Sequence, residues 1–102
     1  MTSAEILAFV EREINGDWER SNLHGVVLKE CLVEPLKIDS IDANGESFGT
    51  WVVLHECPPS GPGYAVVFDE VSRQFGLAQF AHGYQPCVIG LYGTFFDALE
   101  AM

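Results

Sequence analysis

Basic residues are scarce in this chain, and their scarcity excludes two classes of partner. The 102 residues include 5 Lys and Arg against 15 Asp and Glu, which gives a formal net charge of −10 at pH 7. Such a charge repels the phosphates of nucleic acid and the headgroups of anionic lipid, and it attracts basic proteins. We therefore expect no nucleic acid and no membrane among the partners, and a basic protein if the chain works by binding.

Cysteine is also scarce, and it is spaced too widely for a disulfide framework. The chain has 3 cysteines, Cys31, Cys57 and Cys87, and an odd number at wide spacing is typical of reduced, mostly buried thiols. The N-terminus lacks the basic and apolar regions of a secretory signal. The longest uncharged stretch, 74–96, is interrupted by Pro86 and by glycines, so it is not a membrane span. These absences predict a cytoplasmic protein.

Apolar side chains, in contrast, are plentiful. The chain is 48% hydrophobic with a mean hydropathy of +0.15, so it can bury a core and is not a disordered acidic tail. Its length corresponds to a single domain, 1–102. Because the interior takes the apolar residues, most carboxylates must lie on the surface.

Helical periodicity appears at both ends of the chain. Residues 2–15 repeat apolar side chains at helical intervals, and Thr2 and Glu5 have the spacing of a capping box. Residues 94–102 predict a second, short helix, for which Thr94 is the expected N-cap.

Between the helices, alternating and β-branched segments predict about five strands, at 36–43, 47–56, 63–70, 75–80 and 87–92. Residues 25–34 fit both a strand and a helix, and their β-branched content favours a strand. Asn44-Gly45 predicts a two-residue hairpin turn with positive φ at both positions. The expected fold class is α+β: an antiparallel sheet of about five strands in a hairpin meander, packed with an N-terminal helix and a short C-terminal helix.

No set of residues forms a recognisable catalytic or metal-binding motif. His55 and Cys57 would share one face of a strand, and His82 precedes Cys87, but neither pair has the spacing of a structural zinc site. A Cys–His nucleophile pair needs electropositive surroundings, and no Lys or Arg follows Arg73. We therefore expect no metal, no cofactor and no catalytic residue.

Trp18 is the most distinctive candidate for binding, because it lies in a polar segment between Asp17 and Glu19. It either anchors this segment onto the N-terminal helix or serves as a binding hot spot. Asp69 and Glu70, at the end of a predicted strand, can project towards the same partner. The predicted binding residues are Trp18, Asp17, Glu19, Asp69 and Glu70.

Two functions are compatible with these features. The first is a small acidic interaction module without catalysis, of inhibitor, immunity or adaptor type, that binds a basic partner protein. The alternative is a small-molecule-binding protein or small enzyme, with an aromatic pocket that uses His55, Cys57, His82 or Cys87. We favour the first function and leave catalysis open.

The last third of the chain, 74–102, carries only Asp97 and Glu100 as charged residues. Much of it must therefore be buried. It either forms central strands with a covering helix, which we favour, or it packs against a second copy in a homodimer.

Overall fold

The computed structural model describes residues 1–56, 63–80 and 85–102. Two helices, α1 (Ser3–Ile14) and the short α2 (Leu28–Cys31), precede the strands, and α3 (Phe95–Ala101) follows them. The strands are β1 (Leu32–Ile41), β2 (Ser47–His55), β3 (Gly63–Asp69), β4 (Gln74–Phe80) and β5 (Cys87–Gly93). Consecutive strands pair antiparallel, so the predicted α+β meander with a helix at each end is confirmed.

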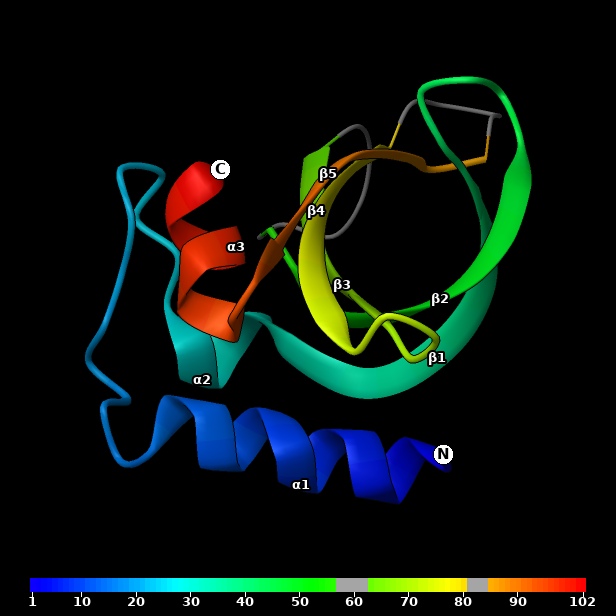
Figure 1. The fold of residues 1–102 in the computed structure, drawn as a ribbon. Coiled ribbons are helices and arrows are strands. Elements are labelled where there is room, and N and C mark those ends of the chain that lie inside the picture. Colours follow the sequence, from blue (N-terminus) through cyan, green and yellow to red (C-terminus); the bar gives the residue numbers. More distant parts are fainter. Residues whose placement is uncertain (57–62, 81–84) are drawn as a thin grey trace.

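The five strands close into a barrel instead of forming an open sheet (Figure 1). Strand β5 returns to β1 through one parallel ladder pair, Ile41 with Cys87. Beside it, the amide of Ile41 donates to the carbonyl of Pro86 at 2.9 Å. The closure therefore depends on this short contact. Beyond Cys87, no strand among the described residues pairs with this edge of β5.

Two separate clusters of apolar side chains lie on the two faces of the barrel wall. The inner cluster consists of small residues: Val52, Ala65, Val67, Ala78 and Val88. The buried hydroxyl groups of Ser40 and Thr50 satisfy each other by a hydrogen bond of 2.8 Å. The narrow interior of the barrel favours small side chains at the fully buried positions, and the larger Phe48 and Phe80 pack against this cluster while partly exposed.

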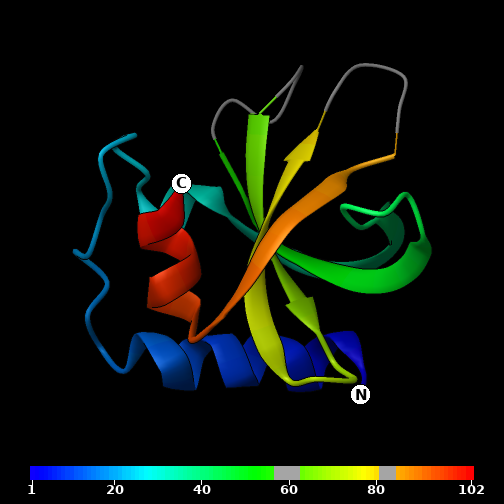
Figure 2. The same ribbon diagram turned by 45° about the horizontal axis from the view of Figure 1, so that its top comes forward.

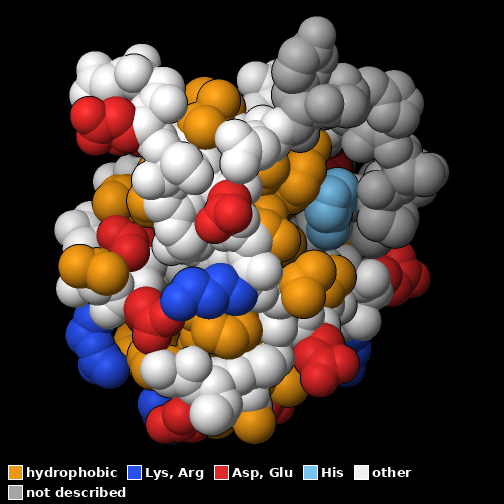
Figure 3. Space-filling model, turned by 90° about the vertical axis from the view of Figure 1, so that its right-hand side faces the viewer, with side chains coloured by type: hydrophobic (Ala, Val, Ile, Leu, Met, Phe, Trp, Pro, Cys, Tyr) orange, Lys and Arg blue, Asp and Glu red, His pale blue; other side chains and the backbone are white. Residues whose placement is uncertain are grey.

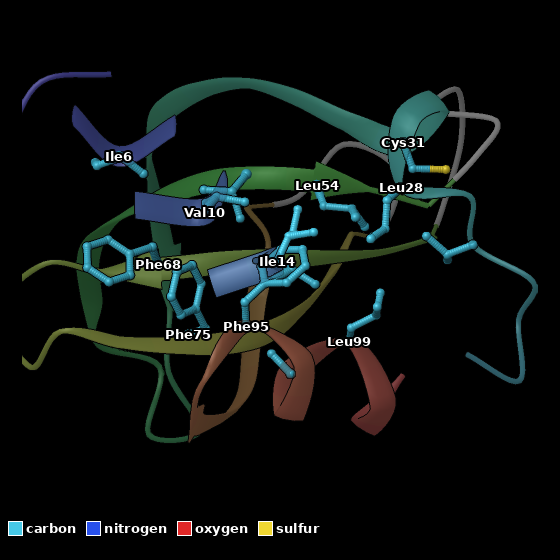
Figure 4. Packing of buried hydrophobic residues seen from close by; sticks show 14 residues of the cluster. Ile6, Val10, Ile14, Leu28, Cys31, Leu54, Phe68, Phe75, Phe95 and Leu99 are labelled. Carbon is cyan, nitrogen blue, oxygen red and sulfur yellow. The ribbon is translucent and has the colours of Figure 1, made fainter. Parts of the chain in front are cut away.

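The outer cluster joins the barrel to the helices, and its larger members are labelled in Figure 4. The rings of Phe68 and Phe75 lie 4.9 Å apart between centroids, and Phe95 of α3 meets Phe75 edge-on at 5.6 Å. Ile6 and Val10 of α1 are fully buried in the same cluster. Figure 2 shows α1 and α3 next to each other on the outside of the barrel.

Both predicted helix starts are confirmed by their caps. Thr2 and Glu5 form the capping box of α1, and Asn15 ends the helix in the left-handed conformation with φ of 51°. The Thr94 hydroxyl accepts the amide of Asp97 at 3.1 Å. None of the described helices has the length and apolar content that a membrane crossing requires.

The favoured strand over 25–34 is wrong for residues 25–31, and only 32–34 belong to a strand. Residues 28–31 form the single helical turn α2, because Leu28 and Cys31, three positions apart, both bury their side chains in the outer cluster. Strand β1 then begins at Leu32 and continues through Pro35, where its register with β2 shifts. Since proline has no amide to donate, it is tolerated at such an irregularity in the ladder.

The hairpin at Asn44-Gly45 is confirmed, but its predicted two-residue turn is wrong. The Asp42 amide donates to the Glu46 carbonyl at 2.9 Å, so the loop is longer. Of the pair, only Gly45 has positive φ, at 79°. The Asp42 carboxylate accepts the amides of Asn44 and Glu46 at 2.8 and 3.0 Å, which favours a longer turn that begins at an aspartate.

Candidate interaction surface

The segment around Trp18 is held against the rest of the molecule by packing and ion-pair contacts. Trp18 is partly buried and packs against the outer cluster. Its neighbour Asp17 is 3.4 Å from a guanidinium nitrogen of Arg20, and the same guanidinium binds Glu100 and lies 4.5 Å above the Phe96 ring. The packing of Trp18 corresponds to the anchor described above, while Asp17 and Glu19 remain exposed.

Glu70 is the centre of an internal ion-pair cluster, which we call the Glu70 corner. Its carboxylate accepts hydrogen bonds from the N-terminal ammonium of Met1 at 3.0 Å, from Lys37 at 3.0 Å and from the Trp51 indole at 3.2 Å. The bond from the N-terminal ammonium, followed by those from Lys37 and Trp51, lowers the pKa of Glu70 to about 2. Glu70 therefore ties α1 to β1 and β2.

Asp69 is also engaged within the chain. It is nearly buried, with a relative exposure of 9%. Its carboxylate accepts the amide of Val71 at 3.2 Å and the hydroxyl of Ser72 at 2.8 Å. These bonds stabilise the turn after β3, as aspartate commonly does at the first position of a turn.

Of the four histidines and cysteines of the alternative hypothesis, the structure describes His55 and Cys87. Cys57 and His82 lie outside the described residues. The ring of His55 packs on Phe80 at 5.0 Å, and Cys87 lies at the closure of the barrel. Within residues 1–56, 63–80 and 85–102, no three His, Cys, Asp or Glu side chains are grouped to hold a metal ion.

A contact between distant residues was missed in the sequence: the His24 ring pairs with the Glu56 carboxylate. The edge of the His24 ring also faces Tyr64, with 5.6 Å between centroids. Because residues 24 and 56 share no local pattern, only the folded chain reveals this pair.

An open groove of about 370 Å³ lies between the β1–β2 loop and β5, and we call it the β5 groove. Phe48 and Val88 form its base and also pack into the inner cluster. Ile89 and Leu91 line it with relative exposures of 50% and 38%. The described residues that line it are Asp42, Ala43, Glu46, Ser47, Phe48, Val88, Ile89, Gly90 and Leu91.

The rim of the β5 groove is acidic. Glu46 is exposed, and its carboxylate forms no hydrogen bond or ion pair with any residue that the structure describes. One carboxylate oxygen of Asp42 accepts the hydrogen bonds from the amides of Asn44 and Glu46 within the loop. Among the described residues, no Lys, Arg, His or Cys lines the groove, so its chemistry is suited to binding a cationic and apolar group.

Two other grooves adjoin α1. One, of about 430 Å³, is lined by apolar residues with Glu34 as its charged member. The other, of about 340 Å³, brings Arg12 and Arg73 together with Glu5. Among these three grooves of the described chain, the β5 groove combines exposed apolar side chains, an unpaired strand edge and an unbound carboxylate.

Figure 3 shows the face on the right of Figure 1, where the β1–β2 hairpin lies. Asp and Glu side chains are interspersed there with hydrophobic ones. Comparisons of the chain with protein-family models, with curated proteins and with solved structures found no match. The function must therefore be inferred from the chemistry of the surface itself.

Proposed function

We propose that this protein is a small acidic interaction module, of inhibitor, immunity or adaptor type, that binds a basic partner protein at the β5 groove without catalysis. The observation that carries this proposal is the unbound Glu46 carboxylate beside the exposed Ile89 and Leu91. An apolar centre with a charged rim is the usual composition of a protein–protein interface.

The overall charge supports a basic partner. At −10, the chain attracts cationic surfaces and accelerates their approach. Exposed charges are screened beyond ~8 Å at physiological salt. Association should therefore slow as the salt concentration rises.

A homodimer through the same groove is a weaker candidate. Among the described residues of the last third, the large apolar side chains that are exposed, Ile89, Leu91 and Tyr92, lie on β5. A homodimer would, however, bring the Glu46 carboxylates of two copies close together, and each copy carries a net charge of −10. Like charges in close apposition oppose such a pairing.

The alternative small-molecule function gains nothing from this groove, because neither His55 nor Cys87 lines it. It would require a pocket that includes those side chains.

The proposal can be tested with three immobilised proteins: wild type, Glu46→Lys and the matched control Glu11→Lys. Glu11 is exposed on α1, away from the groove lining, and its reversal changes the net charge by the same amount. Cell extract is applied at low salt and eluted with a salt gradient. Wild type and Glu11→Lys should retain basic proteins that elute as salt rises, and Glu46→Lys should lose them.

Two results would count against the proposal. One is retention of only acidic or neutral proteins that stay bound at high salt. The other is equal retention by the Glu46→Lys and Glu11→Lys variants.

A further inference from the structure

We infer that the partner contributes a short extended segment that pairs with the free edge of β5, with apolar side chains in the β5 groove and Lys or Arg beside Glu46. This inference rests on the proposed function, and it adds the mode of binding and the chemistry of the bound segment.

The first observation is the unpaired edge of β5. One edge of this strand pairs with β4 from Cys87 to Gly93. The other edge pairs with β1 at Cys87 alone, so beyond Cys87 it lies open along the described chain. The backbone donors and acceptors of an open edge are a template for an added strand.

The second observation is the shape of that edge. The register between β4 and β5 shifts twice, so that Ile89 and Tyr92 are extra residues in β5. Such bulges bend a strand and redirect its side chains. The Tyr92 ring folds over Gly90, since a Cβ atom there would lie 3.1 Å from the Tyr92 hydroxyl oxygen. A bent edge of this length accommodates a short segment and disfavours pairing with a long, flat strand.

The third observation is the chemistry of the groove beside this edge. Side chains of an added strand alternate between its two faces. The set that enters the groove can contact its apolar side chains, Ile89, Leu91 and Phe48, and can also reach the carboxylates of Glu46 and Asp42. The bound segment should therefore carry apolar residues and Lys or Arg at every second position, on the face that enters the groove.

This charge pattern distinguishes a foreign segment from a second copy of the chain. Residues 74–102 contain no Lys or Arg. A second β5 placed along the first would therefore leave Glu46 without a cationic partner, whereas a basic segment would supply one.

The test uses a library of short random peptides displayed on phage, selected at low salt against the whole protein. The enriched peptides should carry apolar and basic residues at every second position, and selection against Glu46→Lys should not enrich them. In a synthetic enriched peptide, N-methylation of single amides should weaken binding at every second position, as expected for a paired strand. Bound peptide should slow hydrogen exchange of the β5 amides.

The possible failures separate the inference from the proposed function. Basic peptides that bind with helical spacing, that tolerate N-methylation at all positions or that protect amides elsewhere would overturn strand addition and leave a basic partner in place. Failure to enrich any basic peptide would overturn both. A concentration-dependent dimer that is lost in Ile89→Asp and kept in Leu23→Asp would overturn the foreign segment in favour of a second copy.

Discussion

The Glu70 corner and the β5 groove each contain a glutamate next to the end of a β-strand, but the two carboxylates have different surroundings. Glu70 accepts hydrogen bonds from the N-terminal ammonium, Lys37 and Trp51. Glu46 receives none from the described residues and lies beside exposed apolar side chains. The first carboxylate holds the fold together, and the second is available to a partner.

This difference shows why net charge alone does not locate a binding surface. Lys37 and Arg20, two of the few cations, already pair with Glu70 and Glu100. Under the proposed function, a basic partner should therefore bind where these internal pairs leave carboxylates unneutralised.

The largest effect on stability is expected from breaking the loop that carries the groove's rim. Gly45→Val should lower the free energy of unfolding by about 1–2 kcal/mol, because a β-branched residue resists the φ of 79° at this position. Chemical denaturation measures the loss. The control is Asn44→Val, because Asn44 does not have a positive φ. This variant should lose less stability, and equal losses would mean that the strain does not arise at Gly45.

The second prediction concerns how stability depends on pH, which should differ between the carboxylates of Glu70 and Glu46. The pKa of Glu70 is lowered from 4.5 to about 2 in the folded protein, so its stabilisation is present above pH 4.5 and is lost as pH falls towards 2. Glu70→Gln should be less stable than wild type at pH 7, and the difference should vanish near pH 2. Thermal melts across this range check it. Glu46→Gln removes the same charge without a hydrogen bond, so an equal loss in that variant would contradict the comparison.

A smaller effect on stability is expected at the groove itself. Ile89→Asp should change the free energy of unfolding by no more than about 0.5 kcal/mol, because half of the side chain is already exposed. Partner binding should nevertheless weaken at least about tenfold, as for a central interface residue. Leu23→Asp, at a position 99% exposed, makes the same change outside the groove. If it weakened binding as much, the groove would not be the docking site.

No effect at all is expected from a chelator. The described residues bring no metal-binding cluster together, so thermal melts with and without strong chelator should coincide. A drop of several degrees in the chelated sample would contradict this and would direct attention first to His55 and Cys57.

Much of the fold could be predicted because its signals are local. The capping box of Thr2 and Glu5 marked the start of α1, and alternation marked the strands. The closure of the barrel could not be predicted, since it depends on Ile41 meeting Cys87 across the molecule. The turn at Gly45 is longer than predicted because the Asp42 carboxylate accepts hydrogen bonds from two backbone amides of the loop. The turn preference of Asn-Gly alone does not predict these bonds.

The site was harder to predict than the fold. Glu70 was expected to bind a partner, but its donors come from residues 69 and 33 positions away in the chain. Ile89 and Leu91, which line the β5 groove, were not among the residues predicted to bind. The sequence signal for this surface was the nearly uncharged last third of the chain. Its strands and helix do not bury all of its apolar residues, so some of them remain exposed.

The central claim is that a basic partner approaches the acidic rim of the β5 groove. The most direct measurement is the association rate of the purified partner with wild type and three single reversals, Glu46→Lys, Glu19→Lys and Glu11→Lys, over a series of salt concentrations. The account predicts that Glu46→Lys slows association most and flattens its salt dependence, while the other two remain close to wild type. Equal slowing by all three, or the largest slowing by Glu19→Lys, would contradict it.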